Sequence, residues 1–269
     1  MPGLVRSIGA FFRVAIQVMF HYRAEMFLWA VWGVVYPAVA MAMWRAAIGG
    51  SADGGQIGGY DARGFAGYFI ATMVVGHFST AWDVYEMGYL IRSGKMSAKL
   101  LRPILPLWES FADNLAYKTL TISILAPIWL LVVWLTDPRF DLSAANLPAG
   151  IAATILGGLL NYLWGYNLAL GAFWITRIEA AGQLWFGASL ALGGRLAPIS
   201  IMPLPLQYLA MMLPFQWMIY FPVSVLLGRA SPTQMVQGLL IQCLWLIGGI
   251  VAFQMIWRRA LRRYSAVGA

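Results

Sequence analysis

Four basic residues recur at intervals of three or four positions within residues 88–105 of this chain. They are interleaved with apolar residues in the order Arg92, Lys95, Met96, Lys99, Leu100, Leu101, Arg102 and Ile104. Residues three or four apart share one face of a helix, so this spacing predicts a short amphipathic helix with a basic face. Such a helix can lie on a bilayer surface or present apolar anchors to a soluble partner.

The same stretch contains a near match to a phosphate-binding loop, Gly88-x5-Gly94-Lys95-Met96. A phosphate loop has four residues between its glycines, and the Ser or Thr after its Lys coordinates Mg²⁺. Here the glycines are separated by one residue too many, Met96 follows the lysine, and no strand is expected before Gly88. We therefore expect no nucleotide site in this segment.

Motifs for catalysis or metal binding are also missing from the sequence. Neither HExxH nor GxSxG occurs. Glu109 and Asp113 are one helical turn apart, and we expect them to be solvated or ion-paired rather than an acid–base pair. Cys243 is the single cysteine, and His21 and His77 are far apart, so we expect no metal site and no internal disulfide.

Polar residues inside apolar runs are the remaining candidates for a substrate pathway. Four of them lie deep and could bind substrate or hydrogen-bond between helices: His77, Asn161, Asn167 and Gln242. Ion-coupled carriers usually place ionisable residues near mid-membrane. The charged residues expected inside spans all lie towards span ends: Asp113, Lys118 and Arg195. Active transport by this chain would therefore need a partner to supply the energy.

The composition requires a membrane to position these residues. Of the 269 residues, 61% are hydrophobic and 10% are charged, against about 45–50% apolar and about 25% charged residues in soluble domains. The length allows roughly six spans at about 20 residues each. We predict an all-α chain forming one transmembrane domain over residues 1–269, with spans near 24–48, 64–81, 106–135, 148–175, from 183, and 232–257.

Three further segments complete this prediction. Residues 3–22 form an amphipathic helix suited to the membrane interface. The second helix is expected to continue past the membrane to Gly94, where glycine suits a helix C-cap. Six of the 13 prolines fall between Pro198 and Pro232, and they cut residues 198–231 into pieces too short to span. We predict re-entrant helices at 206–213 and 215–227, followed by a helix start at Ser231.

The fourth predicted span carries small residues at four-residue spacing, Gly150, Thr154 and Gly158. Such a strip allows another helix to approach closely. We interpret it as an internal packing face rather than a dimer seam.

The distribution of basic residues predicts which side of the membrane each segment faces. With six spans and a cytoplasmic N-terminus, three basic residues lie outside: Arg63, Arg139 and Arg229. Twelve lie in the cytoplasm: Arg6, Arg13, Arg23, Arg92, Lys95, Lys99, Arg102, Arg177, Arg258, Arg259, Arg262 and Arg263. We therefore expect both termini and the segment 88–105 to be cytoplasmic.

This arrangement resembles the permease subunits of ABC-2-type transporters, and its local motifs look like a bacterial branch of that family. The resemblance covers nearly the whole chain. It is carried by Ile91-Arg92-Ser93-Gly94-Lys95 with Leu100-Leu101-Arg102-Pro103, by Gly193-Gly194-Arg195-Leu196-Ala197-Pro198, and by Leu213-Pro214-Phe215 followed by Pro222 and Gly228.

The resemblance implies a subunit of an exporter in the bacterial cytoplasmic (inner) membrane. ATP hydrolysis in separate cytoplasmic subunits would drive the transport. Two copies of a cytoplasmic ATPase would bind ATP and Mg, and this chain would hold no cofactor. A second permease subunit, identical or related, would complete the pathway; membrane lipids would surround it, and no nucleic acid would bind. Segment 88–105 would be the coupling segment, with ATPase contacts at Arg92, Gly94, Lys95, Lys99, Leu100, Leu101 and Arg102. Met96 would also serve as an apolar anchor.

Two other classes of function stay open. A self-sufficient channel or secondary carrier would need more ionisable groups in mid-membrane than the sequence offers. A membrane-bound lipid enzyme would need a polar catalytic cluster, and none is visible.

Overall fold

The computed structural model describes residues 2–49, 55–140 and 146–264, and helices dominate these ranges. The longer helices are α1 (Pro2–His21), α2 (Arg23–Gly49), α3 (Ala62–Ser79), α4 (Asp83–Arg92), α6 (Pro106–Thr136), α7 (Asn146–Ala169), α8 (Glu179–Leu192), α9 (Leu204–Met212) and α12 (Pro232–Arg263). The short ones are α5 (Met96–Leu100), η1 (Leu170–Phe173), η2 (Ile199–Ile201), α10 (Phe215–Met218) and α11 (Tyr220–Leu226). The all-α prediction is confirmed for the described residues.

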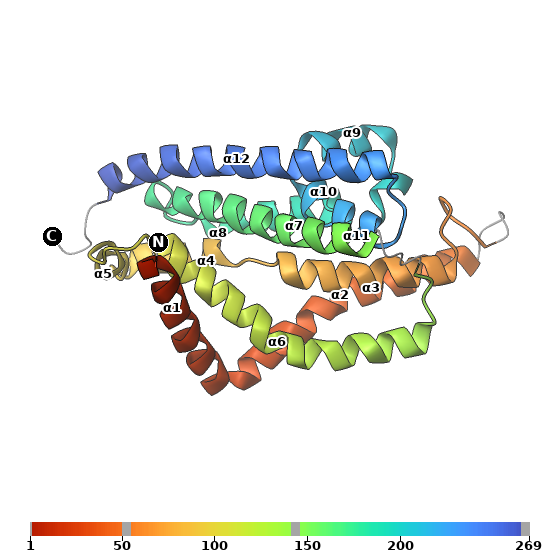
Figure 1. The fold of residues 1–269 in the computed structure, drawn as a ribbon, viewed down its shortest axis with the longest axis horizontal. Helices are drawn as coiled ribbons and strands as arrows, with labels where there is room; N and C mark the ends of the chain where they lie inside the picture. Colours follow the sequence, from red (N-terminus) through yellow and green to blue (C-terminus); the bar gives the residue numbers. More distant parts are fainter. Residues whose placement is uncertain (1, 50–54, 141–145, 265–269) are drawn as a thin grey trace.

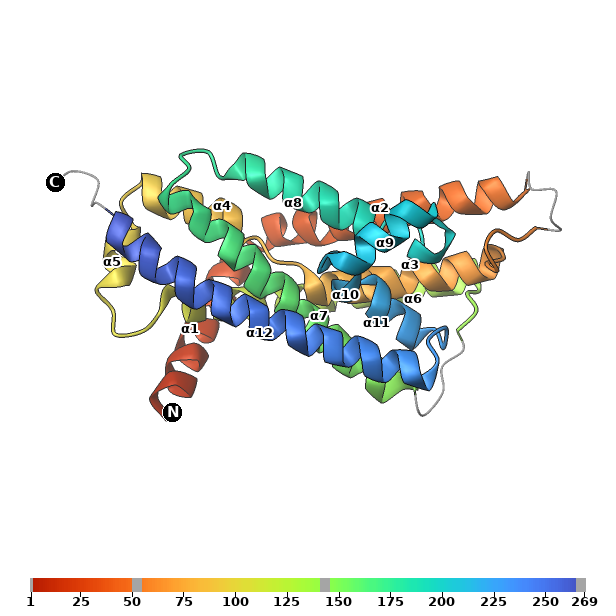
Figure 2. The ribbon, with the colours of Figure 1, turned by 90° about the horizontal axis from the view of Figure 1, so that it is seen from above.

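The molecule is an elongated bundle. Helices α7 and α12 run side by side along its long axis, and α3 lies beneath them between α2 and α7 (Figures 1 and 2). One apolar core joins α3 to the short helices α10 and α11, and a second joins α4 and α5 to η1 and the end of α12. The second core is important for the site because it holds the coupling segment against the bundle.

Five helices among the described residues are long and apolar enough to cross a membrane: Gly3–His21, Arg23–Gly49, Pro106–Thr136, Asn146–Phe173 and Pro232–Arg263. The predicted count of six is not confirmed. The predicted second and fifth spans correspond to α3 and α8, which have 18 and 14 residues. At 1.5 Å per residue they are about 27 and 21 Å long, shorter than a hydrocarbon core of about 30 Å.

Helix α1 qualifies as a span by length and composition, but its direction differs from that of the bundle. It crosses the long axis steeply in both views and packs against α6 (Figures 1 and 2). The interfacial helix over residues 3–22 therefore stays a prediction.

The second predicted helix is not continuous, and this expectation was wrong. α3 ends at Ser79, Thr80 has extended backbone angles, and α4 begins at Asp83. Neither proline nor glycine lies in the break. Hydrogen-bond donors from α6 and α7 stabilise it instead, as described below.

The proline-rich segment 198–231 forms α9, α10 and α11 rather than two helices. The predicted piece 215–227 divides at Ile219, whose φ of −135° and ψ of −59° interrupt the helix. The predicted start of α12 is confirmed as a capping box. The Ser231 hydroxyl accepts from the Gln234 amide at 3.3 Å, and the Gln234 side chain accepts from the Ser231 amide at 2.9 Å.

The small-residue strip on α7 packs inside the chain, as predicted. A Cβ added to Gly150 would collide with the Leu226 side chain, and one added to Gly158 would lie 2.8 Å from the Phe78 carbonyl oxygen. Thr154 is buried between them. The strip therefore lets α3 and α11 approach α7 closely.

Candidate functional site

The predicted coupling segment forms a tight corner at one end of the bundle, beside the end of α12 (Figures 1 and 2). Helix α4 ends at Arg92, and Gly94 takes a left-handed φ of +71° before α5 begins. An L-residue in this conformation is strained by roughly 1–2 kcal/mol, so glycine suits the position. The predicted cap is confirmed, and it turns α5 sharply away from α4.

Arg92 connects this corner to the start of α8. Its guanidinium lies 2.6 Å from a carboxylate oxygen of Glu179 and donates to the Thr176 carbonyl at 3.0 Å. The hydrogen bond from Arg92 holds the pKa of the Glu179 carboxyl below its ordinary value. The pair is therefore charged at neutral pH and links the two polar turns at this end of the molecule.

Lys99 and Arg102 are also paired within the chain. Lys99 Nζ lies 3.5 Å from carboxylate oxygens of both Glu86 and Glu109, and Arg102 lies 3.0 Å from Glu109. The expectation that Glu109 is ion-paired is thus confirmed. Lys99 and Glu109 are only 15% and 19% exposed, whereas Glu86 and Arg102 are about half exposed. The outer members of this network are therefore the ones that can exchange partners at small cost.

Lys95 has an aromatic partner. Its ammonium lies 4.7 Å from the centre of the Tyr89 ring and donates to the Tyr89 hydroxyl at 2.6 Å. Each of the four basic side chains therefore contacts another part of the chain. They hold the corner in shape, and pairing with an outside partner would require these contacts to loosen.

The apolar residues of α5 separate into inner and outer positions. Met96 is fully buried in the second core, so it cannot anchor an outside partner, contrary to expectation. Leu100 is partly buried against the same core. Leu101 is 87% exposed, more than any other large apolar side chain in the described ranges. Ser97 and Tyr264 hydroxyls lie 2.7 Å apart and tie α5 to the end of α12.

The break between α3 and α4 is a polar site that the sequence did not indicate directly. Two carbonyl groups freed there are hydrogen-bonded by side chains from neighbouring helices. Asn161 of α7 donates to the Ser79 carbonyl, while Asn114 at 3.1 Å and Lys118 at 2.8 Å donate to the Thr80 carbonyl. A buried backbone carbonyl without a hydrogen-bond partner is costly. These three side-chain donors therefore allow the helix to break inside the bundle.

Buried polar residues continue below the break, at the start of α4. Asp83 accepts a hydrogen bond from Ser110 of α6, and both side chains are buried. Sequence reasoning missed both. The spacing Thr80-x-x-Asp83 is typical of a helix start, and it could have indicated the break. In the structure, however, the Thr80 hydroxyl donates to the Gly76 carbonyl and does not cap α4.

The four deep polar residues all hydrogen-bond between helices, which supports the interhelical alternative over a substrate role. Besides Asn161, His77 Nε2 pairs with the Lys118 carbonyl at 3.2 Å, and Asn167 donates to the Gly249 carbonyl at 2.9 Å. Gln242 donates to the carbonyls of Ala153 at 2.9 Å and Trp217 at 2.7 Å. In each case the acceptor belongs to a different helix.

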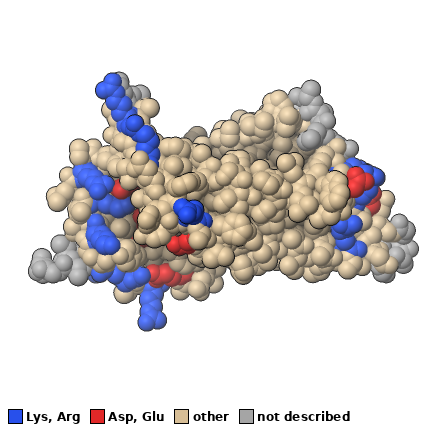
Figure 3. All heavy atoms as spheres, turned by 90° about the horizontal axis from the view of Figure 1, so that it is seen from below, with Lys and Arg blue, Asp and Glu red and all other residues tan. Residues whose placement is uncertain are grey.

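Charge on the molecular surface is unevenly distributed. Lys and Arg side chains gather at the end that carries α5, and a smaller mixed group of both signs marks the opposite end (Figure 3). Between them the visible face is almost free of charge. Within the described ranges, no three His, Cys, Asp or Glu side chains are placed to hold a metal ion.

These features define a multi-pass helical membrane protein with an uncharged middle and a structured basic corner at one end. Comparison with known families is more specific. The family model described as ABC-2 family transporter protein matches residues 51–268. The match covers well over half of the chain, so the protein belongs to this family of membrane transport components. No curated protein and no solved structure matches it.

Proposed function

We propose that this chain is the permease subunit of an ATP-driven exporter and that the corner formed by α4 and α5 docks on a separate cytoplasmic ATPase. The single observation that carries the proposal is the exposure of Leu101 on a corner whose other side chains are held in place. Leu101 is 87% exposed while its neighbours on the corner pack or pair within the chain, and apolar anchors presented in this way fill grooves in helix recognition.

In the rest of the proposal, the charge distribution supports the orientation of the chain and the ABC-2 family supports its partners. The basic end with α5 faces the cytoplasm, and so do both termini. Helix α1 lies at the cytoplasmic interface, and α9–α11 enter the outer leaflet and return. Two ATPase copies bind ATP and Mg outside this chain, and a second permease subunit completes the substrate pathway.

The break at residues 80–82 changes how movement reaches the membrane in this proposal. A continuous helix would transmit ATPase motion as one rigid rod. Here α4 can tilt relative to α3, while the donors Asn114, Lys118 and Asn161 follow the freed carbonyls. Because Asn114 and Lys118 belong to α6 and Asn161 to α7, the same motion reaches three helices at once.

The direct test is co-purification with the ATPase encoded by a neighbouring gene that contains a phosphate loop. Leu101→Asp should abolish association and permease-stimulated ATP hydrolysis while leaving the thermal stability of the purified permease unchanged. Leu147→Asp is the matched control, because Leu147 is also exposed but lies in the first turn of α7 at the opposite end. Equal association of both variants would refute docking through α5.

A further inference from the structure

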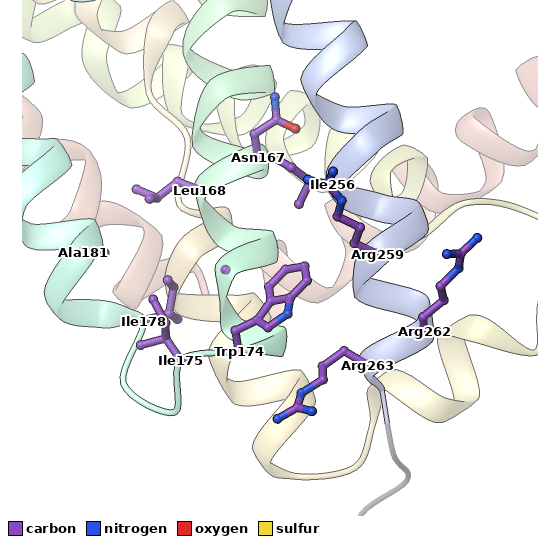
Figure 4. A pocket seen from close by; sticks show the side chains of 11 residues that line it. Asn167, Leu168, Trp174, Ile175, Ile178, Ala181, Ile256, Arg259, Arg262 and Arg263 are labelled. Carbon is purple, nitrogen blue, oxygen red and sulfur yellow. The ribbon is translucent and has the colours of Figure 1, made fainter.

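A pocket of about 720 Å³ opens beside the last turns of α12, between that helix and the turn joining η1 to α8 (Figure 4). It lies outside the coupling corner and has two kinds of lining. Arg259, Arg262 and Arg263 border it on the α12 side. Trp174, Ile175 and Ile178 line it on the other.

The three arginines differ from the basic residues of the coupling corner. All three are exposed, and none forms an ion pair or side-chain hydrogen bond within the described residues. Figure 4 shows the Arg263 side chain extending beneath Trp174, whereas the Arg262 side chain, on the same turn of α12, points away from Trp174. The unpaired guanidinium groups of Arg259 and Arg263 favour a ligand with concentrated negative charge, and guanidinium suits phosphate in particular.

The opposite wall of the pocket is apolar and partly open to the surroundings. Trp174 is 47% exposed and Ile175 is 51% exposed, whereas Ile178 is buried. A small hydrophilic anion would gain nothing from these side chains. A ligand that joins a phosphate to hydrocarbon would cover them, so the two walls together indicate an amphipathic anion.

The position along α12 places this pocket at the level of lipid headgroups. The helix has 32 residues, about 48 Å at 1.5 Å per residue, whereas the hydrocarbon core is about 30 Å thick. The helix is thus about 18 Å longer than the core, and the four arginines in its last two turns place the excess at its C-terminal end. Tryptophan beside basic residues is typical of the interface, and basic pockets between spans on the cytoplasmic side suit anionic headgroups.

We propose that this pocket binds an anionic phospholipid of the cytoplasmic leaflet, with the headgroup phosphate between Arg259 and Arg263 and the acyl chains along Trp174 and Ile175. The inference requires the basic end to face the cytoplasm but does not depend on ATPase docking. The lipid would connect the end of α12 to the η1–α8 turn, which also carries the Glu179 partner of Arg92.

The experiment is native mass spectrometry of the full-length permease in detergent, titrated with dioleoylphosphatidylglycerol. Each surface arginine is worth about a 5-fold change in affinity for anionic lipid, so the double alanine variant of Arg259 and Arg263 should bind roughly 25-fold more weakly. Arg258→Ala is the matched control for Arg263→Ala. Arg258 is an exposed arginine on the same helix but does not line the pocket.

The expected result is retention of phosphatidylglycerol by the wild type and by Arg258→Ala, with about 5-fold weaker binding by Arg263→Ala. Dioleoylphosphatidylcholine and inorganic phosphate should each bind far more weakly than phosphatidylglycerol. Equal losses in Arg258→Ala and Arg263→Ala would overturn the proposal, as would equal binding of phosphatidylcholine or of phosphate alone. Retention of the lipid only when an ATPase is bound would assign this face to that partner instead. If the double variant does not fold, the two single variants decide the question.

Discussion

Gln242 offers the sharpest test of how the short helices before α12 are held. Its side chain is fully buried and donates two hydrogen bonds to carbonyls in two other elements, Ala153 in α7 and Trp217 in α10. Leucine has a similar volume but no donor. The change Gln242→Leu therefore leaves both acceptors without this partner and preserves the packing.

The size of the effect follows from those two bonds. Interhelical side-chain hydrogen bonds in membrane proteins average about 0.6 kcal/mol and reach about 1.7 kcal/mol. Two of them predict a loss of about 1–3 kcal/mol in the free energy of unfolding. At roughly 2–4 °C per kcal/mol for a chain near this size, Tm should fall by about 3–10 °C.

The assay is thermal unfolding of the purified permease in a mild detergent. Gln237→Leu is the control, because Gln237 lies on the same helix but is exposed. An exposed substitution should change stability by less than about 0.5 kcal/mol. If Gln242→Leu and Gln237→Leu unfold at the same temperature, the two hydrogen bonds do not hold α10 against α7 and α12, and the reasoning fails.

Two further predictions concern packing and the coupling corner. Gly157→Ala should destabilise the protein, because the added Cβ would lie 2.5 Å from the Met218 carbonyl oxygen. Gly165→Ala, on the same helix, is the control: its Cβ would meet nothing within 4 Å, so it should stabilise the protein by about 0.5–1 kcal/mol. Unfolding curves that rank the two alanines the other way would contradict this packing. Because the folded-state pKa of Glu179 is depressed, the stabilisation from its pair with Arg92 should be present at neutral pH and be lost as pH falls through that lowered pKa. Unfolding measured against pH should show that Glu179→Gln removes this acid-side loss, and an unchanged profile would show that the pair is not formed.

Features governed by local sequence were predictable. The membrane class followed from composition, and two helix boundaries followed from the residues that form them: Gly94 with its left-handed φ after α4, and the Ser231 capping box before α12. In each case the controlling residues are neighbours in sequence. Helix signals of this kind act within one or two turns.

The features that the sequence did not predict depend on distant residues. The break after Ser79 is stabilised by Asn114 and Asn161, which lie 34 and 82 positions from the carbonyls they bond. Between 79 and 83 the local signal is the Thr80-x-x-Asp83 spacing, and the Thr80 side chain does not cap α4. Distant residues also decide which apolar residues near α5 are buried. The helical spacing predicts an apolar face, but the packing of α4 and α7 determines that Met96 is enclosed and Leu101 is exposed.

Photo-cross-linking from position 101 tests the central claim most directly. Leu101→Cys and, as control, Leu147→Cys would each be made in a Cys243→Ala background, because Cys243 is exposed and is the single native cysteine. Each is then labelled with benzophenone maleimide and illuminated in membranes that contain the ATPase. Docking through α5 predicts a permease–ATPase adduct from position 101 and none from position 147. Equal yields from both positions, or no adduct from position 101 in membranes that hydrolyse ATP in a permease-dependent manner, would contradict it.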